Sequence, residues 1–169
     1  LKTIKMTGFG DKRNRAHDSK ASQIETNIHK SLIAYQNGNH KKAKKFVEKA
    51  LAANSKHSLA LGLLATIEKA IGNHYKAEPL FEESLQYSES NPDILHNYSD
   101  LLAEKDLEKA IQISNKAVNI CPNHSGYLER NGYLKLKAGD LDNALKATLQ
   151  ALQVSPGLID ARINLGVIY

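Results

Sequence analysis

Small residues recur through the sequence with a period close to 34 residues, and such a period restricts a chain to a few kinds of fold. The recurrence forms three series, which are Ser31, Ala65, Ser99, Gly132 and Gly166; Ala43, Ala77, Ala110 and Ala144; and Ala50, Ser84, Ala117 and Ala151. In each series all steps are 34 residues except one of 33, and the overlap of these shorter steps places a one-residue deletion between residues 99 and 110. Units of about 20 to 50 residues that repeat in this way stack on their neighbours to bury a continuous core.

Each unit has the pattern of two antiparallel helices. Apolar side chains return every three or four residues, as at Leu61, Leu64 and Ala65, which is the spacing of one face of an α-helix. Small residues at fixed positions let two such helices approach closely. Residues that suit the N-cap of each second helix follow the expected turns, namely Asn39, Asn73, Asp106 and Asp140. The pattern predicts an all-α fold, an α-solenoid of stacked antiparallel helix pairs.

The fourth unit resembles the tetratricopeptide repeat family. It combines Gly132, Gly139-Asp140-Leu141, Ala144, Ala151-Leu152 and Pro156 at the spacing of that family. The early Trp of the family is absent, and the first unit has Ser55 where proline is common. The resemblance implies a right-handed superhelix with units at residues 24–57, 58–91, 92–124 and 125–158, and a partial fifth unit at residues 159–169.

A basic N-terminal arm, residues 1–20, is expected to precede the repeat array, residues 21–169. The arm has six Lys and Arg against two Asp, which accounts for +4 of the formal charge of +5. The array is therefore close to neutral, and it lacks a basic stripe interleaved with aromatic residues. We interpret the arm as a solvated or partner-contacting tail and predict no nucleic-acid binding.

The repeat explains the groups that would otherwise suggest chemistry. His40 and His74 are 34 residues apart and so occupy the same site in adjacent units rather than forming a metal pair. Glu82 and Glu83 are adjacent on a helix and point apart, which disfavours an acid/base dyad. The sequence contains no phosphate-binding loop and no zinc-hydrolase motif. We predict that the chain is not an enzyme and uses no cofactor or metal.

Two further features bear on the compartment. Cys121 is the single cysteine, so it cannot form an internal disulfide, and this fits a reducing compartment. No apolar stretch approaches the roughly 18 residues that span a bilayer. We expect a cytoplasmic protein without a membrane partner.

A lysine-rich segment lies in the second helix of the first unit. It contains Lys41, Lys42, Lys44, Lys45 and Lys49. These side chains should face outward and be mostly solvated, and contact with an acidic partner is the alternative.

The family resemblance implies a concave groove lined by the first helix of each unit, where a peptide or partner protein lies. We expect the groove of units three to five to be the main binding surface, because consecutive first helices gather the candidate residues Asn97, Asp100, Arg130, Tyr133 and Asn164 there. Asn can pair with a peptide backbone, Arg offers a fork to a carboxylate, and Tyr supplies rigid contact area. The alternative is that Arg130 pairs with Asp100 or Glu129 and only stabilises the stack.

We therefore expect a non-catalytic scaffold that binds a protein or peptide segment. The alternative function is the N-terminal repeat region of a larger enzyme of glycosyltransferase, sulfotransferase or hydroxylase type, in which similar repeats occur. The fifth unit has one predicted helix, whose apolar residues Leu165 and Ile168 would need cover from more chain or from another molecule. Self-association through this helix is thus a further expectation.

Overall fold

The computed structural model describes residues 10–88 and 90–169, with side chains from residue 19 onward. In this part of the chain the structure consists of helices and contains no strand. The helices are α1 (Gly10–Gln36), α2 (His40–Ala53), α3 (Ser58–Ala70), α4 (His74–Tyr87), α5 (Pro92–Leu102), α6 (Leu107–Ile120), α7 (Ser125–Lys137), α8 (Leu141–Val154) and α9 (Ile159–Ile168). The predicted all-α class is confirmed.

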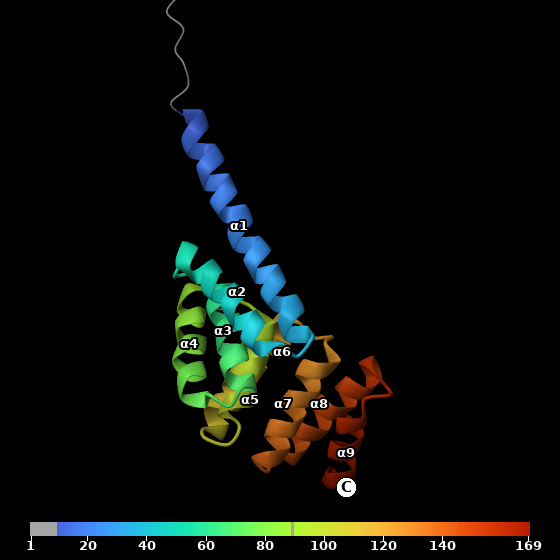
Figure 1. Ribbon diagram of the computed structural model, residues 1–169. Helices are drawn as coiled ribbons and strands as arrows, with labels where there is room; N and C mark the ends of the chain where they lie inside the picture. Colours follow the sequence, from blue (N-terminus) through green and yellow to red (C-terminus); the bar gives the residue numbers. More distant parts are fainter. Residues whose placement is uncertain (1–9, 89) are drawn as a thin grey trace, which may run out of the picture.

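The helices form two layers. Each odd-numbered helix contacts the next odd-numbered one, from α1 to α9, whereas contacts between even-numbered helices are lacking in the described residues. Each even-numbered helix instead packs against the odd-numbered helices before and after it in the chain. The odd helices therefore make a closely spaced inner layer and the even helices a splayed outer layer, which is the arrangement of an α-solenoid (Figure 1).

The small residues of the repeat lie where the two helices of a pair touch. Ser31, Ala43, Ala65 and Ala77 are fully buried, and the hydroxyl of Ser31 donates to the carbonyl oxygen of Ala43 over 2.8 Å. At Gly132 an added Cβ would lie 2.8 Å from Oγ1 of Thr148, too close for a side chain to fit without movement. The explanation of the repeat by close helix contacts is confirmed.

The turns inside the pairs follow two designs. Three of them contain a glycine with positive φ, which are Gly38 (72°), Gly72 (84°) and Gly139 (79°). The turn after α5 has no glycine, and α5 has 11 residues whereas α3 and α7 have 13. The missing residue of the repeat is thus absorbed at the end of α5, and both helices of that unit keep their packing.

The predicted N-caps begin the even-numbered helices. Side chains of Asn39, Asp106 and Asp140 each accept a hydrogen bond from a backbone N–H in the first turn. Asn73 occupies the cap position of α4 without such a bond, because its amide donates to the Glu68 carboxylate over 2.7 Å. Glu68 is buried and also receives the ammonium of Lys44 at 2.6 Å, so it ties α2 to the turn before α4.

α1 is longer than any other described helix, with 27 residues. The division predicted at residues 20 and 21 coincides with no break in it, because residues 11–36 contain neither glycine nor proline to end a helix. Its N-terminal half projects beyond the other helices (Figure 1). The first nine residues of the predicted arm lie outside the described residues, and the arm as a separate unit stays a prediction.

Candidate functional site

Three inner helices are linked by a chain of charges. Lys69, in the last turn of α3, places its ammonium 2.5 Å from one oxygen of Asp100 on α5. Arg130 on α7 places its guanidinium 2.8 Å from the other oxygen of the same carboxylate. One anion thus faces two cations from neighbouring helices, and all three side chains are partly exposed on the inner surface.

The electrostatics of Asp100 follow from this position. Partial burial by itself would raise the pKa of the Asp100 carboxyl, but the hydrogen bond from Lys69 and the charges of Lys69 and Arg130 outweigh it and hold the pKa below its usual value. Asp100 is consequently ionised at neutral pH and fixes both cations.

Arg130 is held in place and stays partly exposed. Its guanidinium lies 5.2 Å from the centre of the Tyr133 ring, one turn further along α7, so it is held between that ring and Asp100. Its Nε is buried and has no hydrogen-bond partner within residues 19–88 and 90–169. The predicted alternative, in which Arg130 pairs with Asp100, describes the geometry of this chain, and 26% of the Arg130 side chain is exposed.

The amide of Asn97 is engaged inside the structure. Its oxygen lies 3.4 Å from the ammonium of Lys69, and its nitrogen donates to the carbonyl oxygen of Asp93 over 2.9 Å. Asn97 therefore helps to position Lys69 next to Asp100, and its side chain already uses a donor and an acceptor.

Asn164 lies deeper than the sequence analysis expected. Its side chain is buried between α7 and α9 with 6% of its surface exposed, and its amide donates to Glu129 over 3.1 Å. Partial burial raises the pKa of Glu129, while Arg130 and Asn164 act in the opposite direction and only reduce the shift. Asn164 thus joins two helices and is not presented to an extended ligand in this structure.

An aromatic group borders the charge chain on α5 and α7. The hydroxyl of Tyr127 lies 2.5 Å from the Asp93 carboxylate, and the ring of Tyr127 is 5.4 Å from that of His96. Burial and the nearby charge of Arg130 lower the pKa of His96, so its imidazole is neutral at neutral pH. None of these three residues is among the five predicted site residues.

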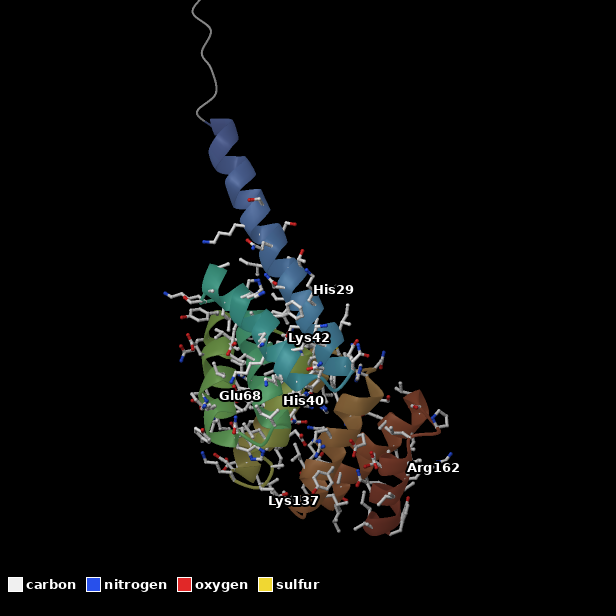
Figure 2. All side chains as sticks on the ribbon, viewed as in Figure 1. His29, His40, Lys42, Glu68, Lys137 and Arg162 are labelled. Carbon is white, nitrogen blue, oxygen red and sulfur yellow. The ribbon has the colours of Figure 1, made fainter. Side chains whose placement is uncertain are left out.

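A final polar contact lies at the other end of α7. The ammonium of Lys137 is 2.5 Å from the Glu104 carboxylate and 3.0 Å from the carbonyl oxygen of Ala103, in the turn after α5 (Figure 2). Every junction between neighbouring inner helices from α3 to α9 is thus bridged by a polar contact. The residues joined are 30 to 35 positions apart, close to one repeat, and this spacing is a signal that could have marked Lys69 as a partner of Asp100.

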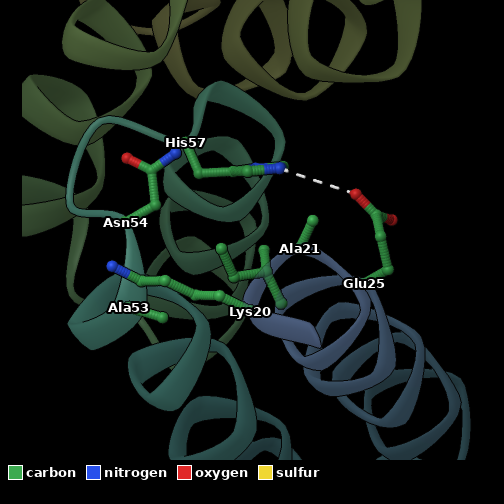
Figure 3. A pocket seen from close by; sticks show the side chains of 7 residues that line it. Lys20, Ala21, Glu25, Ala53, Asn54 and His57 are labelled. Carbon is green, nitrogen blue, oxygen red and sulfur yellow. Dashed lines mark ion pairs between the residues drawn. The ribbon is translucent and has the colours of Figure 1, made fainter. Parts of the chain in front are cut away.

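The described chain also has depressions outside the network of Lys69, Asp100 and Arg130. One of about 400 Å³ lies between α1 and the connection from α2 to α3, where His57 and Glu25 approach to 3.7 Å (Figure 3). Among the described residues no cluster of His, Cys, Asp and Glu has the arrangement of a metal site. A search of the same residues for a helix long and apolar enough to cross a membrane finds none.

Comparison with known proteins identifies one repeat unit and the fold. The tetratricopeptide repeat model matches residues 24–57, whereas no curated protein sequence matches the chain. Among solved structures, the chain is similar to YrrB, described as a TPR protein with an unusual peptide-binding site, with a TM-score of 0.73, 22% identity and coverage of 92% of this chain and 81% of YrrB. It is also similar to pilF of Pseudomonas aeruginosa, with a TM-score of 0.76, 20% identity and coverage of 89% and 77%.

A third similar structure is MamA, with a TM-score of 0.73, 17% identity and coverage of 88% of this chain and 82% of MamA. At these identities the similarity to solved structures is one of fold. The chain thus contains a tetratricopeptide repeat at residues 24–57, and the stacked helix pairs of the described array have the fold of these solved structures.

Proposed function

We propose that the inner surface of α5, α7 and α9 binds an extended segment of another protein, with Arg130 as the main contact. The tetratricopeptide repeat fold itself supports a protein-interaction role, and YrrB is described as having a peptide-binding site on this fold. The observation that carries the proposal is the state of Arg130. It is partly exposed and held in place by Asp100 and Tyr133, and its Nε has no hydrogen-bond partner within the described residues.

The groups around Arg130 favour a ligand that offers oxygen atoms. Lys69 and Arg130 share one anion, so this trio carries one positive charge in excess. A carbonyl or carboxylate oxygen of a peptide can accept a hydrogen bond from the partly exposed guanidinium of Arg130, and the Tyr133 ring supplies an adjoining apolar surface. Since neighbouring inner helices are roughly 10 Å apart, a segment that crosses three of them needs about six extended residues.

The experiment separates binding from stability. A library of peptides of about eight residues, selected on the immobilised protein, would provide a probe whose affinity is then measured by fluorescence anisotropy. Replacing Arg130 by Ala should weaken this probe at least about tenfold and lower the melting temperature only slightly. Arg162→Ala is the control, because Arg162 donates to the carbonyl oxygen of Pro156 and lies outside the charge chain. A lower melting temperature with unchanged binding would make Arg130 purely structural.

A further inference from the structure

A second surface, at the first unit, carries cations that no carboxylate neutralises. Lys42, Lys45 and Lys49 lie three or four residues apart and so follow one side of α2, and Lys30 lies across from them on α1. Within residues 19–88 and 90–169 none of these four lysines forms an ion pair with Asp or Glu. By contrast, the neighbouring Lys44 pairs with Glu68, and Lys69 pairs with Asp100. We call the four residues the lysine rim.

The lysine rim surrounds a small apolar floor formed by Phe46 and Ile33. Two adjoining depressions, of about 440 and 330 Å³, are both lined by Lys42 and Phe46, and Lys42 is seen on α2 beside α1 in Figure 2. The ammonium groups of Lys30 and Lys49 are 6.0 and 5.8 Å from the centre of the Phe46 ring. Ile33 is 45% exposed. Glu48 also lines the larger depression, and its carboxylate lies 4.0 Å from the ammonium of Lys44. The surface is therefore apolar at its centre, with four lysines and one carboxylate at its edge.

The repeat shows what this side of a helix does in other units. Ile33 corresponds to Ile67 in the second unit and to Leu134 in the fourth, and both of those side chains are fully buried in core clusters shared with the preceding unit. On α1 no element of the described chain covers the corresponding side. Lys30 stands where α3 has Leu64 and α5 has the buried Tyr98. A helix packed here would have to bury a lysine or bring it an anion.

The lysines also sit at an unfavourable place in their own helix. The first turn of α2 contains Lys41 and Lys42 and no acidic residue, although the positive end of the helix dipole lies there. Lys41, Lys45 and Lys49 follow at spacings of four, which brings like charges together. Local rules that a sequence breaks without internal compensation are expected at functional surfaces.

We propose that the lysine rim and its apolar floor bind an acidic amphipathic segment of another protein. One or two apolar side chains of the segment would cover Phe46 and Ile33, and its Glu or Asp side chains would face the rim. Charge complementarity selects an acidic partner, and the lysine at position 30 disfavours an uncharged one. The apolar floor lies within depressions between lysines, so a flexible peptide can reach it more readily than the flat surface of an anionic membrane.

The test uses a helical probe of about eleven residues, which spans three helical turns and exceeds the length of the rim. The probe carries Glu at most positions and Leu at every third or fourth position, with a fluorescent label. A second peptide has the same charge with Ser in place of Leu. Binding of each to the full chain is measured by fluorescence anisotropy at about 150 mM salt, where long-range attraction is screened.

Matched variants distinguish this surface from general positive charge. Lys45→Glu with Lys49→Glu should weaken the Leu probe about tenfold. The control is Lys116→Glu with Lys146→Glu, which changes the same repeat positions in the third and fourth units, at exposed lysines without a carboxylate partner in the described chain. The control should stay within about twofold. Ile33→Ser should weaken the Leu probe about fivefold and leave the Ser peptide unchanged.

Circular dichroism melts would show that each variant is folded, and Lys45→Gln with Lys49→Gln serves as a milder pair of substitutions. Equal binding of the two peptides, equal loss in the control, or absence of binding by the Leu probe would each overturn the proposal. Stronger binding of phosphatidylserine vesicles or of a single-stranded oligonucleotide, lost in the rim variant alone, would assign the surface to a membrane or a nucleic acid instead. Arg130→Ala should leave the probe affinity unchanged, so this proposal and the preceding one fail independently.

Discussion

Charged side chains form ion pairs on the inner surface from α3 to α9, whereas the lysine rim on α1 and α2 consists of charges that are unpaired within the part of the chain that the structure describes. On the inner surface, Lys69, Asp100 and Arg130 are locked in one network, and Lys137 is paired with Glu104. At the α1 and α2 end, the lysine rim has no carboxylate partner in the described residues. Paired charges position side chains and add modestly to stability, whereas unpaired ones act at longer range and are screened by salt. The same repeat thus supports one surface whose charged side chains are held in place by ion pairs and another whose unpaired charges act at longer range.

The largest expected effect tests whether the inner surface depends on the close packing beneath it. Replacing Gly132 by Leu should lower the free energy of unfolding by about 2 to 3 kcal/mol, because even a Cβ there meets Thr148 at 2.8 Å and the backbone oxygen of Ala144 at 3.4 Å. Chemical denaturation would measure it. Gly166 occupies the same repeat position with open space around it, so Gly166→Leu is the matched control and should be tolerated.

A smaller effect is expected from breaking the charge network itself. Asp100→Asn leaves Lys69 and Arg130 without their shared anion and should cost about 1 kcal/mol at pH 7. The pKa of Asp100 is lower in the folded state than in the unfolded state, where it is near 4. The stability that the ionised Asp100 contributes is therefore present above the unfolded pKa and is lost as pH falls through the folded pKa. The stability difference between the two proteins should therefore be constant near neutrality and shrink in acid. A stability difference that stays constant down to acid pH would show that ionised Asp100 does not stabilise the network, and the contrast with the lysine rim would fail.

In the lysine rim, by contrast, a charge substitution should raise the stability of the protein. Lys45→Glu turns three like-charge neighbours, Lys41, Lys42 and Lys49, into attractive ones and loses the attraction of one, Glu48. It should therefore stabilise the protein by about 0.5 to 1 kcal/mol at low salt. Adding salt should reduce this gain. Thermal melts at low and high salt would measure both effects. Destabilisation by this substitution would mean that Lys45 has a structural role, and the contrast between the two regions would fail.

The smallest effect concerns Glu129. Since partial burial raises its pKa, the folded state favours the protonated form, and stability falls as pH rises from the unfolded pKa through the raised folded pKa. Glu129→Gln keeps a partner for Asn164 and removes this dependence. It should be neutral or stabilising by less than about 0.5 kcal/mol at pH 7, with no gain below pH 4. Clear destabilisation at pH 7 would show that the Glu129 charge contributes to the network.

Much of the fold could be predicted because the repeat makes each unit a copy of one local pattern. The small residues, the caps at Asn39, Asp106 and Asp140, and the glycine at Gly72 all act over distances of a few residues or between the two helices of one pair. Such short-range requirements are written directly in the sequence. The position of the one-residue deletion was also found from the repeat spacing, and in the structure it lies at the end of α5.

The candidate site was predicted less well, since exposure depends on contacts between units. The inner helices were identified correctly as the source of Asp100 and Arg130, and the alternative pairing of these two residues was foreseen. The burial of Asn164 was not foreseen, because it depends on how far α9 tilts onto α7 and on Glu129 being there to receive the amide. Lys69 joins the network through its contact with Asp100, which lies 31 residues further along the chain, and no local sequence pattern predicts such a contact.

By itself, therefore, the sequence determined that the chain is a stack of helix pairs and where each pair bends. These properties follow from periodicity and from backbone preferences of single residues, whereas the family resemblance indicated which helices form the inner layer. Only the tertiary structure decided which charges are neutralised, which amides are used up and which lysines are left without a partner. The reason is physical: the pairing of a charged side chain is set by the few ångströms between neighbouring units, and those distances arise only when the whole array is packed.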